Sequence, residues 1–286
     1  MGAAVADRFA GGVALVTGAG SGLGEAMAVE LAASGAHVLV TDVDRERATA
    51  VATACVAGGG SAEAHLLDVA DGHAVDALFA SAWEQHGNVD LVVANAGIES
   101  GDRVWDTTPE QWRRVLAVNT DGAFHCARSS VRRMTDQERP GVLAVVASVG
   151  SVTTLPYQSA YIASKQAVLA LVQCLDLELR AADAPVQVSA LLPGWVRTRI
   201  FDDVRRGTEP VDDLARATFA AMAASIQEQG MDPARAASLL LAAVARGEFW
   251  CFTDPERAAQ LFEERARTLR ELRPPERSGW LGSSTA

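Results

Sequence analysis

Cysteine is scarce in this chain of 286 residues, and the four that occur form no metal-binding or disulfide pattern. No two of them stand in a C-x-x-C pair, so their spacing favours neither a zinc site nor a disulfide framework. Free thiols are typical of a reducing cytoplasm, which is the compartment we predict. The five histidines form no H-x-x-x-H pair, and the sequence therefore predicts no metal site. The cysteines are Cys55, Cys126, Cys174 and Cys251, and the histidines are His37, His65, His73, His86 and His125.

Long hydrophobic runs and basic stripes are also missing. The richest apolar segment, 239–252, is interrupted by Arg246 and Glu248, so no segment is expected to span a bilayer. The first residues include Asp7 and Arg8 and lack the apolar run of a secretory signal. A formal net charge of −11 argues against nucleic acid or an anionic membrane as partner. We therefore predict a cytoplasmic protein whose partner is a small-molecule substrate.

Lysine and tyrosine are the rarest of the residues that carry chemistry here. Lys165 is the only lysine among 25 basic residues, and the only tyrosines are Tyr157 and Tyr161. Tyr161 precedes Lys165 by four residues, so on a helix both side chains lie on one face, one turn apart. An ammonium near a phenol favours the phenolate and lowers the tyrosine pKa from its usual value of about 10. The pair therefore predicts a general acid/base that moves a proton on and off an alcohol oxygen.

Short apolar runs alternate with helical patterns along most of the chain. Such alternation predicts an α/β fold of three layers, with a doubly wound parallel sheet of the Rossmann type between helices. The expected strands are 13–16, 37–41, 64–67, 91–94, 141–147, 186–192 and 249–253. The expected helices are 24–35, 44–57, 74–86, 109–134, 157–180, 211–229 and 255–273.

We expect one domain over residues 1–286, with its core at about 9–255. Residues 200–235 break the alternation, since they are first rich in arginine and acidic residues and then helical. Such an excursion beside an α/β core fits either a small helical substrate lid or a surface helix pair. Residues 274–286 are expected to form a tail that is disordered or packed on a partner.

A glycine-rich turn joins the first expected strand to the first expected helix. It reads Thr17-Gly18-Ala19-Gly20-Ser21-Gly22-Leu23-Gly24, with spacing G-x-x-x-G-x-G. Glycines let the backbone approach a pyrophosphate, and the helix N-terminus supplies free N–H groups and a positive dipole. The order of strand, turn and helix therefore predicts a dinucleotide site, whereas a glycine turn without a ligand is the alternative.

Asp42 follows the second expected strand, eighteen residues after Gly24. A carboxylate there accepts hydrogen bonds from the adenosine ribose and repels the extra phosphate of NADP, so NAD is the predicted cofactor. The neutral residues Ser21 and Val43 agree with NAD, whereas the nearby Arg45 keeps NADP as the alternative. Asp42 could instead cap the helix that follows.

Together these motifs resemble the short-chain dehydrogenase/reductase family in its compact single-domain form. The resemblance covers about residues 9–200 and extends to the last expected strand near Phe252. Alanine stands at Ala94, where family members often carry a second asparagine. The motifs are Thr17 to Gly24, Asp42, Asp68, Asn95-Ala96-Gly97, Asn119, Ser148, Tyr161, Lys165 and Pro193-Gly194.

The resemblance implies four catalytic residues. Tyr161 would be the acid/base, Lys165 would lower its pKa and bind the nicotinamide ribose, and Ser148 would hydrogen-bond the substrate oxygen. Asn119 would hold a water of the proton relay behind Lys165. Three of the motif residues also have a purely structural interpretation. Ser148 could be a turn residue at a strand end, Asn119 could be a helix asparagine whose hydrogen bonds are satisfied, and Asp68 could cap the helix that follows it.

The resemblance also implies the cofactor contacts. Asp68 and Val69 would face the adenine, and Asn95 to Gly97 would lie beside the ribose. Val196 and Thr198 would bind the carboxamide. The implied contact residues are Gly18, Ser21, Gly22, Leu23, Gly24, Asp42, Asp68, Val69, Asn95, Ala96, Gly97, Tyr161, Lys165, Pro193, Gly194, Val196 and Thr198.

These observations predict an NAD-dependent oxidoreductase that interconverts a secondary alcohol and a ketone. The alternatives are an NADPH-dependent ketoreductase and a non-catalytic NAD(H)-binding regulator that keeps the fold. The expected pocket residues are mostly apolar, so an apolar and cyclic or aromatic substrate is favoured over a sugar. They are Ile98, Val149, Leu155, Tyr157, Trp195, Phe201 and residues of the 200–235 excursion.

The two long expected helices, 109–134 and 157–180, are the surfaces through which family members commonly pair. The second is apolar on more than one side, and such a helix needs a second surface to cover it. We therefore expect a homodimer or a homotetramer. The apolar residues of that helix include Ala160, Ala163, Ala167, Leu171 and Leu175.

Overall fold

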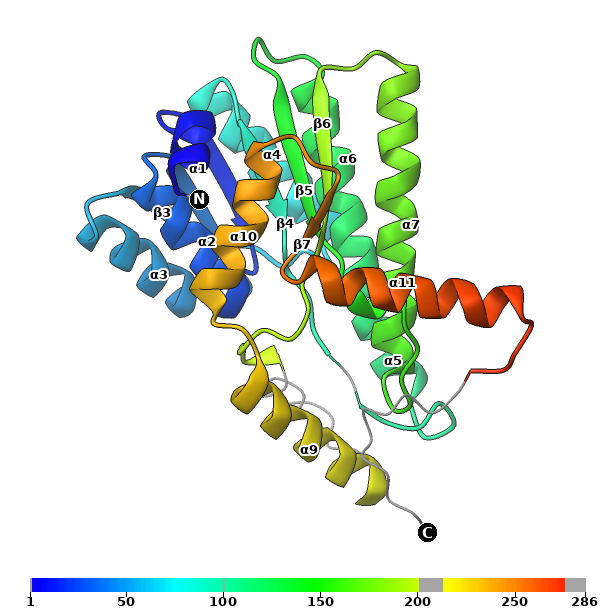
Figure 1. Cartoon of the computed structure of the whole chain (residues 1–286). Coiled ribbons are helices and arrows are strands. Elements are labelled where there is room, and N and C mark those ends of the chain that lie inside the picture. Colours follow the sequence, from blue (N-terminus) through cyan, green and yellow to red (C-terminus); the bar gives the residue numbers. More distant parts are fainter. Residues whose placement is uncertain (1, 100, 201–212, 276–286) are drawn as a thin grey trace.

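A parallel sheet runs through the centre of the molecule (Figure 1). The computed structural model describes residues 2–99, 101–200 and 213–275. Within them, seven strands follow the order β3-β2-β1-β4-β5-β6-β7, and each neighbouring pair is parallel. The chain reverses its direction of travel across the sheet between β1 and β4, which is where doubly wound folds bind ligands.

The strands are short, and all except the edge strand β3 are mostly apolar, as expected for a sheet that is covered on both faces. They are β1 (Val13–Thr17), β2 (His37–Asp42), β3 (Ser61–Leu66), β4 (Leu91–Ala94), β5 (Gly141–Val146), β6 (Val186–Leu192) and β7 (Trp250–Phe252). The main helices are α1 (Gly2–Phe9), α2 (Gly22–Ala33), α3 (Arg45–Ala57), α4 (Gly72–His86), α5 (Pro109–Leu116), α6 (Gly122–Met134), α7 (Ser159–Ala181), α9 (Asp213–Gln229), α10 (Pro233–Ala245) and α11 (Pro255–Arg270).

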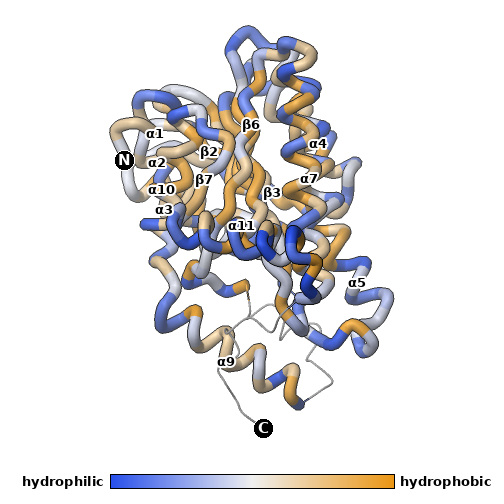
Figure 2. The backbone as a smooth tube through the Cα atoms, turned by 45° about the vertical axis from the view of Figure 1, so that its right-hand side comes forward, coloured by the Kyte–Doolittle hydropathy of each residue, from blue (hydrophilic) through white to orange (hydrophobic). Residues whose placement is uncertain are grey.

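Two hydrophobic cores lie on opposite faces of the sheet. Buried side chains of α1, α2, α3 and α10 form one core, and those of α4, α6 and α7 form the other. Figure 2 shows the strands as a largely hydrophobic centre between these layers. The structure is therefore the three-layer, doubly wound α/β fold that the sequence predicts.

The prediction of a single long helix over 109–134 is wrong in one respect. Residues Ala117–Asp121 form a π-helical turn, η1, between α5 and α6. Asn119 lies in this turn, and its side chain is fixed by residues remote in sequence. Such turns occur often at functional sites, because they change the direction of the side chains and free backbone groups.

Two helices were absent from the expectations. Helix α1 packs on α10 and α2, and α10 packs on α2, so both belong to the core rather than to an excursion. The expected lid over 200–235 therefore overlaps α10 at its C-terminal end. Residues 201–212 and 276–286 lie outside the described residues, and with them most of the expected tail and Phe201.

Helix α9 is what the structure describes of the expected lid. It lies below the sheet in Figure 1, apart from the two helical layers. Phe219 of α9 packs against Gly101, where an added Cβ would collide with its ring. No helix within the described ranges is long and apolar enough to cross a membrane.

Candidate active site

A cavity of about 680 Å³ opens where the strands β1, β4, β5 and β6 end. This is the carboxyl edge of the sheet, where the order of the strands reverses. Every residue predicted to contact a cofactor lines the cavity, and so does Ser148. Asn119 does not line it, but it lies directly behind Gly97, which does.

The glycine turn forms one wall of the cavity and packs closely against the segments after β4 and β6. Gly18 has φ +61°, and an added Cβ would stand 2.7 Å from the Cα of Ala96. Gly22 has φ +60°, and its Cβ would meet the Thr198 side chain at 3.1 Å. Helix α2 begins at Gly22, so its free N–H groups face the cavity edge. A turn of this form, closed by glycine and followed by a helix N-terminus, fits a pyrophosphate.

Asp42 is held in the cavity by backbone donors on both of its oxygens. Its Oδ2 accepts from the Gly20 N–H at 2.9 Å, and its Oδ1 accepts from the Asp44 N–H at 2.9 Å. The helix cap, which was the alternative for Asp42, is provided by Asp44, which accepts from the N–H groups of Glu46 and Arg47. Asp42 therefore does not cap α3.

The basic residue beside Asp42 is Arg47 and not Arg45. Arg47 lines the cavity, Arg45 does not, and the Arg47 guanidinium pairs with Asp44 at 3.2 Å. The sequence analysis considered Ser21, Val43 and Arg45, but it missed Arg47, which lies further along the chain. Arg47 lies in the first turn of α3, and that turn brings it back over the glycine loop, where its Cβ is 2.8 Å from the Cβ position of Gly20.

Asp68 and Asn95 connect the strand ends to the rest of the cavity wall. Asp68 accepts from the Ala70 N–H at 2.9 Å, whereas the cap of α4 is Asp71, so the capping alternative for Asp68 is wrong. The Asn95 amide donates to the carbonyls of Thr17 and Gly18, at 2.9 and 3.1 Å. Asn95 therefore fixes the start of the glycine turn against the end of β4.

Ser148, Tyr161 and Lys165 meet in the same cavity. Ser148 follows β5 and accepts from the Gly150 N–H at 3.0 Å, so it is both a turn residue and a lining residue. Tyr161 and Lys165 lie one turn apart on α7, with the Lys165 Nζ 5.9 Å from the centre of the Tyr161 ring. Lys165 is 3% exposed, and its Nζ donates to the Val146 carbonyl at 2.8 Å.

The expected lowering of the Tyr161 pKa is not found in this structure. Burial raises the pKa of Tyr161 above its usual range, the Glu99 carboxylate raises it further, and a hydrogen bond with Ser148 acts in the opposite direction. Burial also lowers the pKa of Lys165 to about 8, whereas Glu99 acts to raise it. The sequence pattern correctly placed the ammonium near the phenol, but it could not show that both groups are buried beside a carboxylate.

Neighbouring groups take both amide hydrogens of Asn119 and one hydrogen bond to its oxygen. Its Oδ1 accepts from the Ile98 N–H at 2.8 Å, and its amide donates to the Ile98 carbonyl and to Ser164, both at 2.9 Å. No amide hydrogen is left for a water, so a relay water at Asn119 would have to donate to an oxygen. The side chain itself anchors the segment after β4 to α7.

The chain has a doubly wound α/β fold, and its cavity lies at the carboxyl edge of the sheet where such folds bind ligands. Residues 12–209 match the family model of short chain dehydrogenases. The chain therefore belongs to the short-chain dehydrogenase family, whose enzymes are NAD(P)-dependent oxidoreductases.

Individual relatives agree with the family. The chain is 30% identical to a 3beta-hydroxysteroid dehydrogenase of Mediterraneibacter gnavus, over 83% of this chain and 89% of that protein. It is 37% identical to the probable oxidoreductase EphD of Mycobacterium tuberculosis, over 65% of this chain but only 31% of EphD. A short chain dehydrogenase/reductase from Burkholderia phymatum, solved in complex with NAD, is 30% identical and superposes with a TM-score of 0.88. That alignment covers 94% of this chain and 98% of the solved one.

Proposed function

We propose that this protein interconverts a secondary alcohol and a ketone with NAD, and that Tyr161 is its acid/base. The observation that carries the proposal is the meeting of Ser148, Tyr161 and Lys165 in the cavity that the glycine turn enters. A bound nicotinamide cofactor supplies the hydride chemistry. The non-catalytic regulator remains the alternative from another class, but such a protein has no need of these three side chains together.

Each residue would act on a stated atom. The Tyr161 hydroxyl would give its proton to the substrate oxygen during reduction and take it back during oxidation. The Ser148 hydroxyl would donate a hydrogen bond to the same oxygen as negative charge develops there. Lys165 would contact the cofactor ribose, and Asp42 would accept from the adenosine ribose. The glycine turn would hold the pyrophosphate.

The wall of the cavity supports an apolar, cyclic substrate. Ile98, Val149, Leu155 and Trp195 line it, and Met222 and Ile226 of α9 close it from the other side. Tyr157, also expected to line it, does not. Two buried polar side chains, Gln158 and Glu99, also line the cavity. The Gln158 amide donates a hydrogen bond to the Glu99 carboxylate at 3.1 Å. A relative named for a 3beta-hydroxysteroid fits a ring compound of this kind.

Purified protein should be assayed with NAD and a panel of secondary alcohols, following the absorbance of NADH. The panel should contain steroid alcohols, small cyclic alcohols and sugars, so that apolar substrates are compared with polar ones. Turnover with cyclic apolar alcohols supports the proposal. NAD binding without turnover on any member of the panel would favour the regulator instead.

The carboxylate of Glu99 should shift the pH dependence of alcohol oxidation to higher pH. Oxidation needs ionised Tyr161, and both burial and Glu99 raise its pKa, so the oxidation rate should rise with pH well beyond neutrality. Glu99→Gln removes the negative charge and should lower the pKa of Tyr161. The rise of the oxidation rate with pH should therefore begin at lower pH. Reduction needs the protonated phenol and should be little changed near neutral pH.

The matched control is Glu110→Gln, because Glu110 lies exposed on α5. Profiles of oxidation rate against pH for the three proteins provide the measurement. If the pH profile of Glu99→Gln coincides with that of the parent protein, the Glu99 charge does not act on Tyr161.

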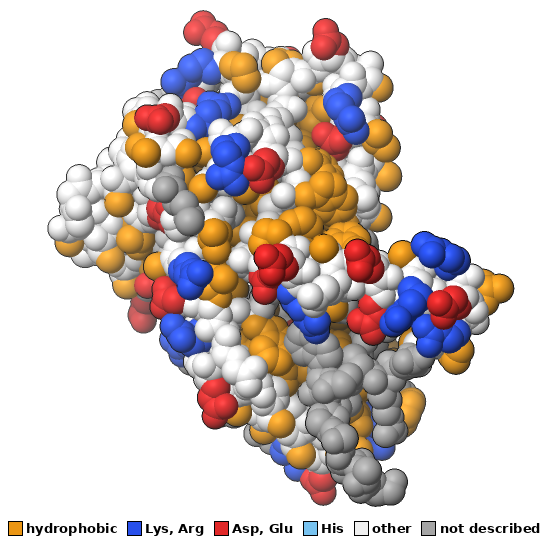
Figure 3. Space-filling model, viewed as in Figure 1, with side chains coloured by type: hydrophobic (Ala, Val, Ile, Leu, Met, Phe, Trp, Pro, Cys, Tyr) orange, Lys and Arg blue, Asp and Glu red, His pale blue; other side chains and the backbone are white. Residues whose placement is uncertain are grey.

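We also propose that the protein pairs through α6 and α7. Phe124 of α6 is 47% exposed and Leu177 of α7 is 61% exposed. Ala167 and Cys174 lie exposed on α7 beside them, whereas Ala160 faces the core. Figure 3 shows hydrophobic side chains along the edge of the molecule that α7 forms, above the projecting helix α11.

Light scattering at micromolar concentration should give at least twice the monomer mass of 30.0 kDa. Leu177→Glu should lower the mass toward the monomer, because a carboxylate would be buried without a partner in the interface. Val56→Glu is the control, since Val56 is 54% exposed on α3, far from this face. A monomeric wild-type protein would refute the pairing.

A further inference from the structure

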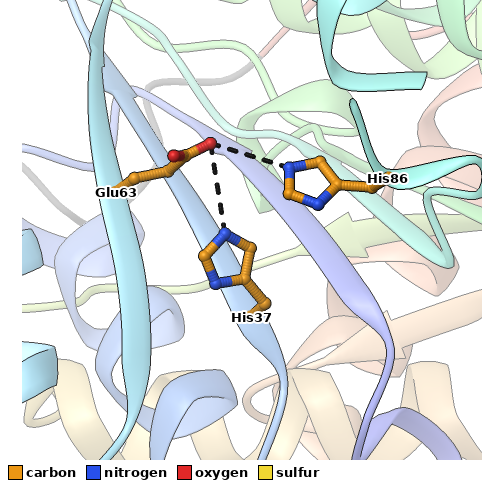
Figure 4. A group of neighbouring side chains, drawn as sticks. All are labelled: His37, Glu63 and His86. Carbon is orange, nitrogen blue, oxygen red and sulfur yellow. Dashed lines mark ion pairs between the residues drawn. The ribbon is translucent and has the colours of Figure 1, made fainter. Parts of the chain in front are cut away.

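Three side chains from three separate elements meet at the end of the sheet opposite the cavity. His37 is the first residue of β2, Glu63 lies in β3, and His86 is the last residue of α4 (Figure 4). Asp42, which lines the cavity, is at the other end of β2, roughly 17 Å away at 3.3 Å per residue. The cluster is therefore separate from the nucleotide site.

The three donor atoms surround a common point. The Glu63 Oε1 lies 3.7 Å from the His86 Nε2 and 4.0 Å from the His37 Nε2, and all three atoms are within 4.8 Å of one another. Figure 4 shows both imidazole nitrogens directed at the same carboxylate oxygen. These separations exceed a hydrogen bond. Four-coordinate ligands bound at about 2.0–2.2 Å lie roughly 3.3–3.6 Å apart, so Glu63 would have to approach each histidine by less than about 1 Å and the two histidines each other by at most about 1.5 Å.

The hydrogen bonds around the cluster leave these nitrogens available. The His37 Nδ1 pairs with the Ser61 hydroxyl at 2.7 Å, and donation from Nδ1 leaves the lone pair on Nε2. The His86 Nε2 is buried and has no hydrogen-bond partner. The His65 Nε2 is 3.0 Å from the Glu63 Oε1 and orients that carboxylate. Metal-binding histidines are usually held by such outer contacts to their other nitrogen, and ligating carboxylates are likewise hydrogen-bonded.

We propose that His37, Glu63 and His86 bind a Zn²⁺ ion, with water as the fourth ligand. Imidazole with one carboxylate suits zinc and related first-row ions, whereas Mg²⁺ and Ca²⁺ prefer oxygen ligands alone. The ion would join the edge strand β3 to β2 and to the end of α4. Its effect is on stability, because no ligand of the ion lines the nucleotide cavity. The sequence could not reveal this site, since its members come from three distant elements.

The test uses tag-free protein in a Cys174→Ser background, because Cys174 is an exposed thiol that could bind zinc by itself. Zinc affinity is measured by competition with a chromogenic chelator, and thermal unfolding is recorded with and without Zn²⁺. At a free zinc concentration of about 100 times Kd, the melting temperature should rise by roughly 5–10 °C. His86→Gln and Glu63→Gln should each weaken zinc binding at least about a hundredfold and abolish this rise, since even outer contacts are worth 10- to 100-fold.

The matched control is His73→Gln, since His73 is an exposed histidine on the same helix as His86. It should bind zinc as the parent protein does. Bound Co²⁺ should also give the strong visible absorption of a four-coordinate ion in the parent and in His73→Gln only. No zinc-dependent rise in the parent, or equal binding by His86→Gln and His73→Gln, would reduce the site to an adventitious ion and overturn the proposal. Melting of the metal-free variants shows whether each has folded.

Discussion

Tyr161→Phe is expected to lower turnover by roughly 10²- to 10⁴-fold, which is the range that positioned acid/base groups contribute. The substitution removes one oxygen, which hydrogen-bonds Ser148 and would carry the transferable proton in the proposed mechanism. The ring stays, so its packing on α7 and the position of Lys165 beside it should be preserved. NAD affinity should change by no more than a few-fold, because the glycine turn and Asp42 are untouched.

Tyr157→Phe provides the matched control, because it makes the same chemical change four residues earlier, outside the cavity lining. Its kcat should remain near that of the parent protein. The measurement is kcat and KM on a verified substrate, with NAD binding followed by calorimetry for all three proteins. A near-normal kcat in Tyr161→Phe would exclude Tyr161 as the acid/base, even if the protein proved to be a dehydrogenase.

The order of strands and helices could be predicted because each buried strand has a distinct apolar run that ends in glycine or a polar residue. The strand Leu91–Ala94 and the strand Val186–Leu192 agree with the expected ranges at both ends. Helix α10 was missed, although Pro233 at its first turn after the capping Asp232 is a readable start signal. It is buried over most of its surface, and such a helix lacks the polar stripe that marks a surface helix.

Features that depend on contacts between distant residues were beyond the sequence. The π-helical turn at Ala117–Asp121 exists where Asn119 reaches Ile98 and Ser164. The pKa of Tyr161 is raised mainly by burial and further by Glu99, a residue that no motif marked. The site residues could be found because their order along the chain resembles a family. Their electrostatic environment could not, because burial and neighbouring charges are properties of the folded chain.

Asp42 should make the protein bind NAD at least about a hundredfold more tightly than NADP. Both carboxylate oxygens are fixed by the backbone, so the group cannot turn away from a 2′-phosphate. Bringing like charges together costs several kcal/mol, and each 1.4 kcal/mol corresponds to a factor of about ten in affinity. Asp42→Ser should therefore reduce the preference for NAD by at least about tenfold, mainly by improving NADP binding. Calorimetric titration with both dinucleotides measures each affinity directly.

Arg47 should determine how much NADP affinity the Asp42→Ser variant gains. It lines the cavity beside Asp42, so once the Asp42 carboxylate is removed its guanidinium, which pairs with Asp44 at 3.2 Å, can also pair with a 2′-phosphate. Arg47→Gln in the Asp42→Ser background should remove the gain in NADP affinity and leave NAD affinity little changed. Glu46→Gln, which removes one negative charge from the same turn of α3, should leave the preference for NAD intact. Equal affinities of the parent protein for NAD and NADP would contradict the role of Asp42 and make Arg47 the determinant of an NADPH-dependent ketoreductase.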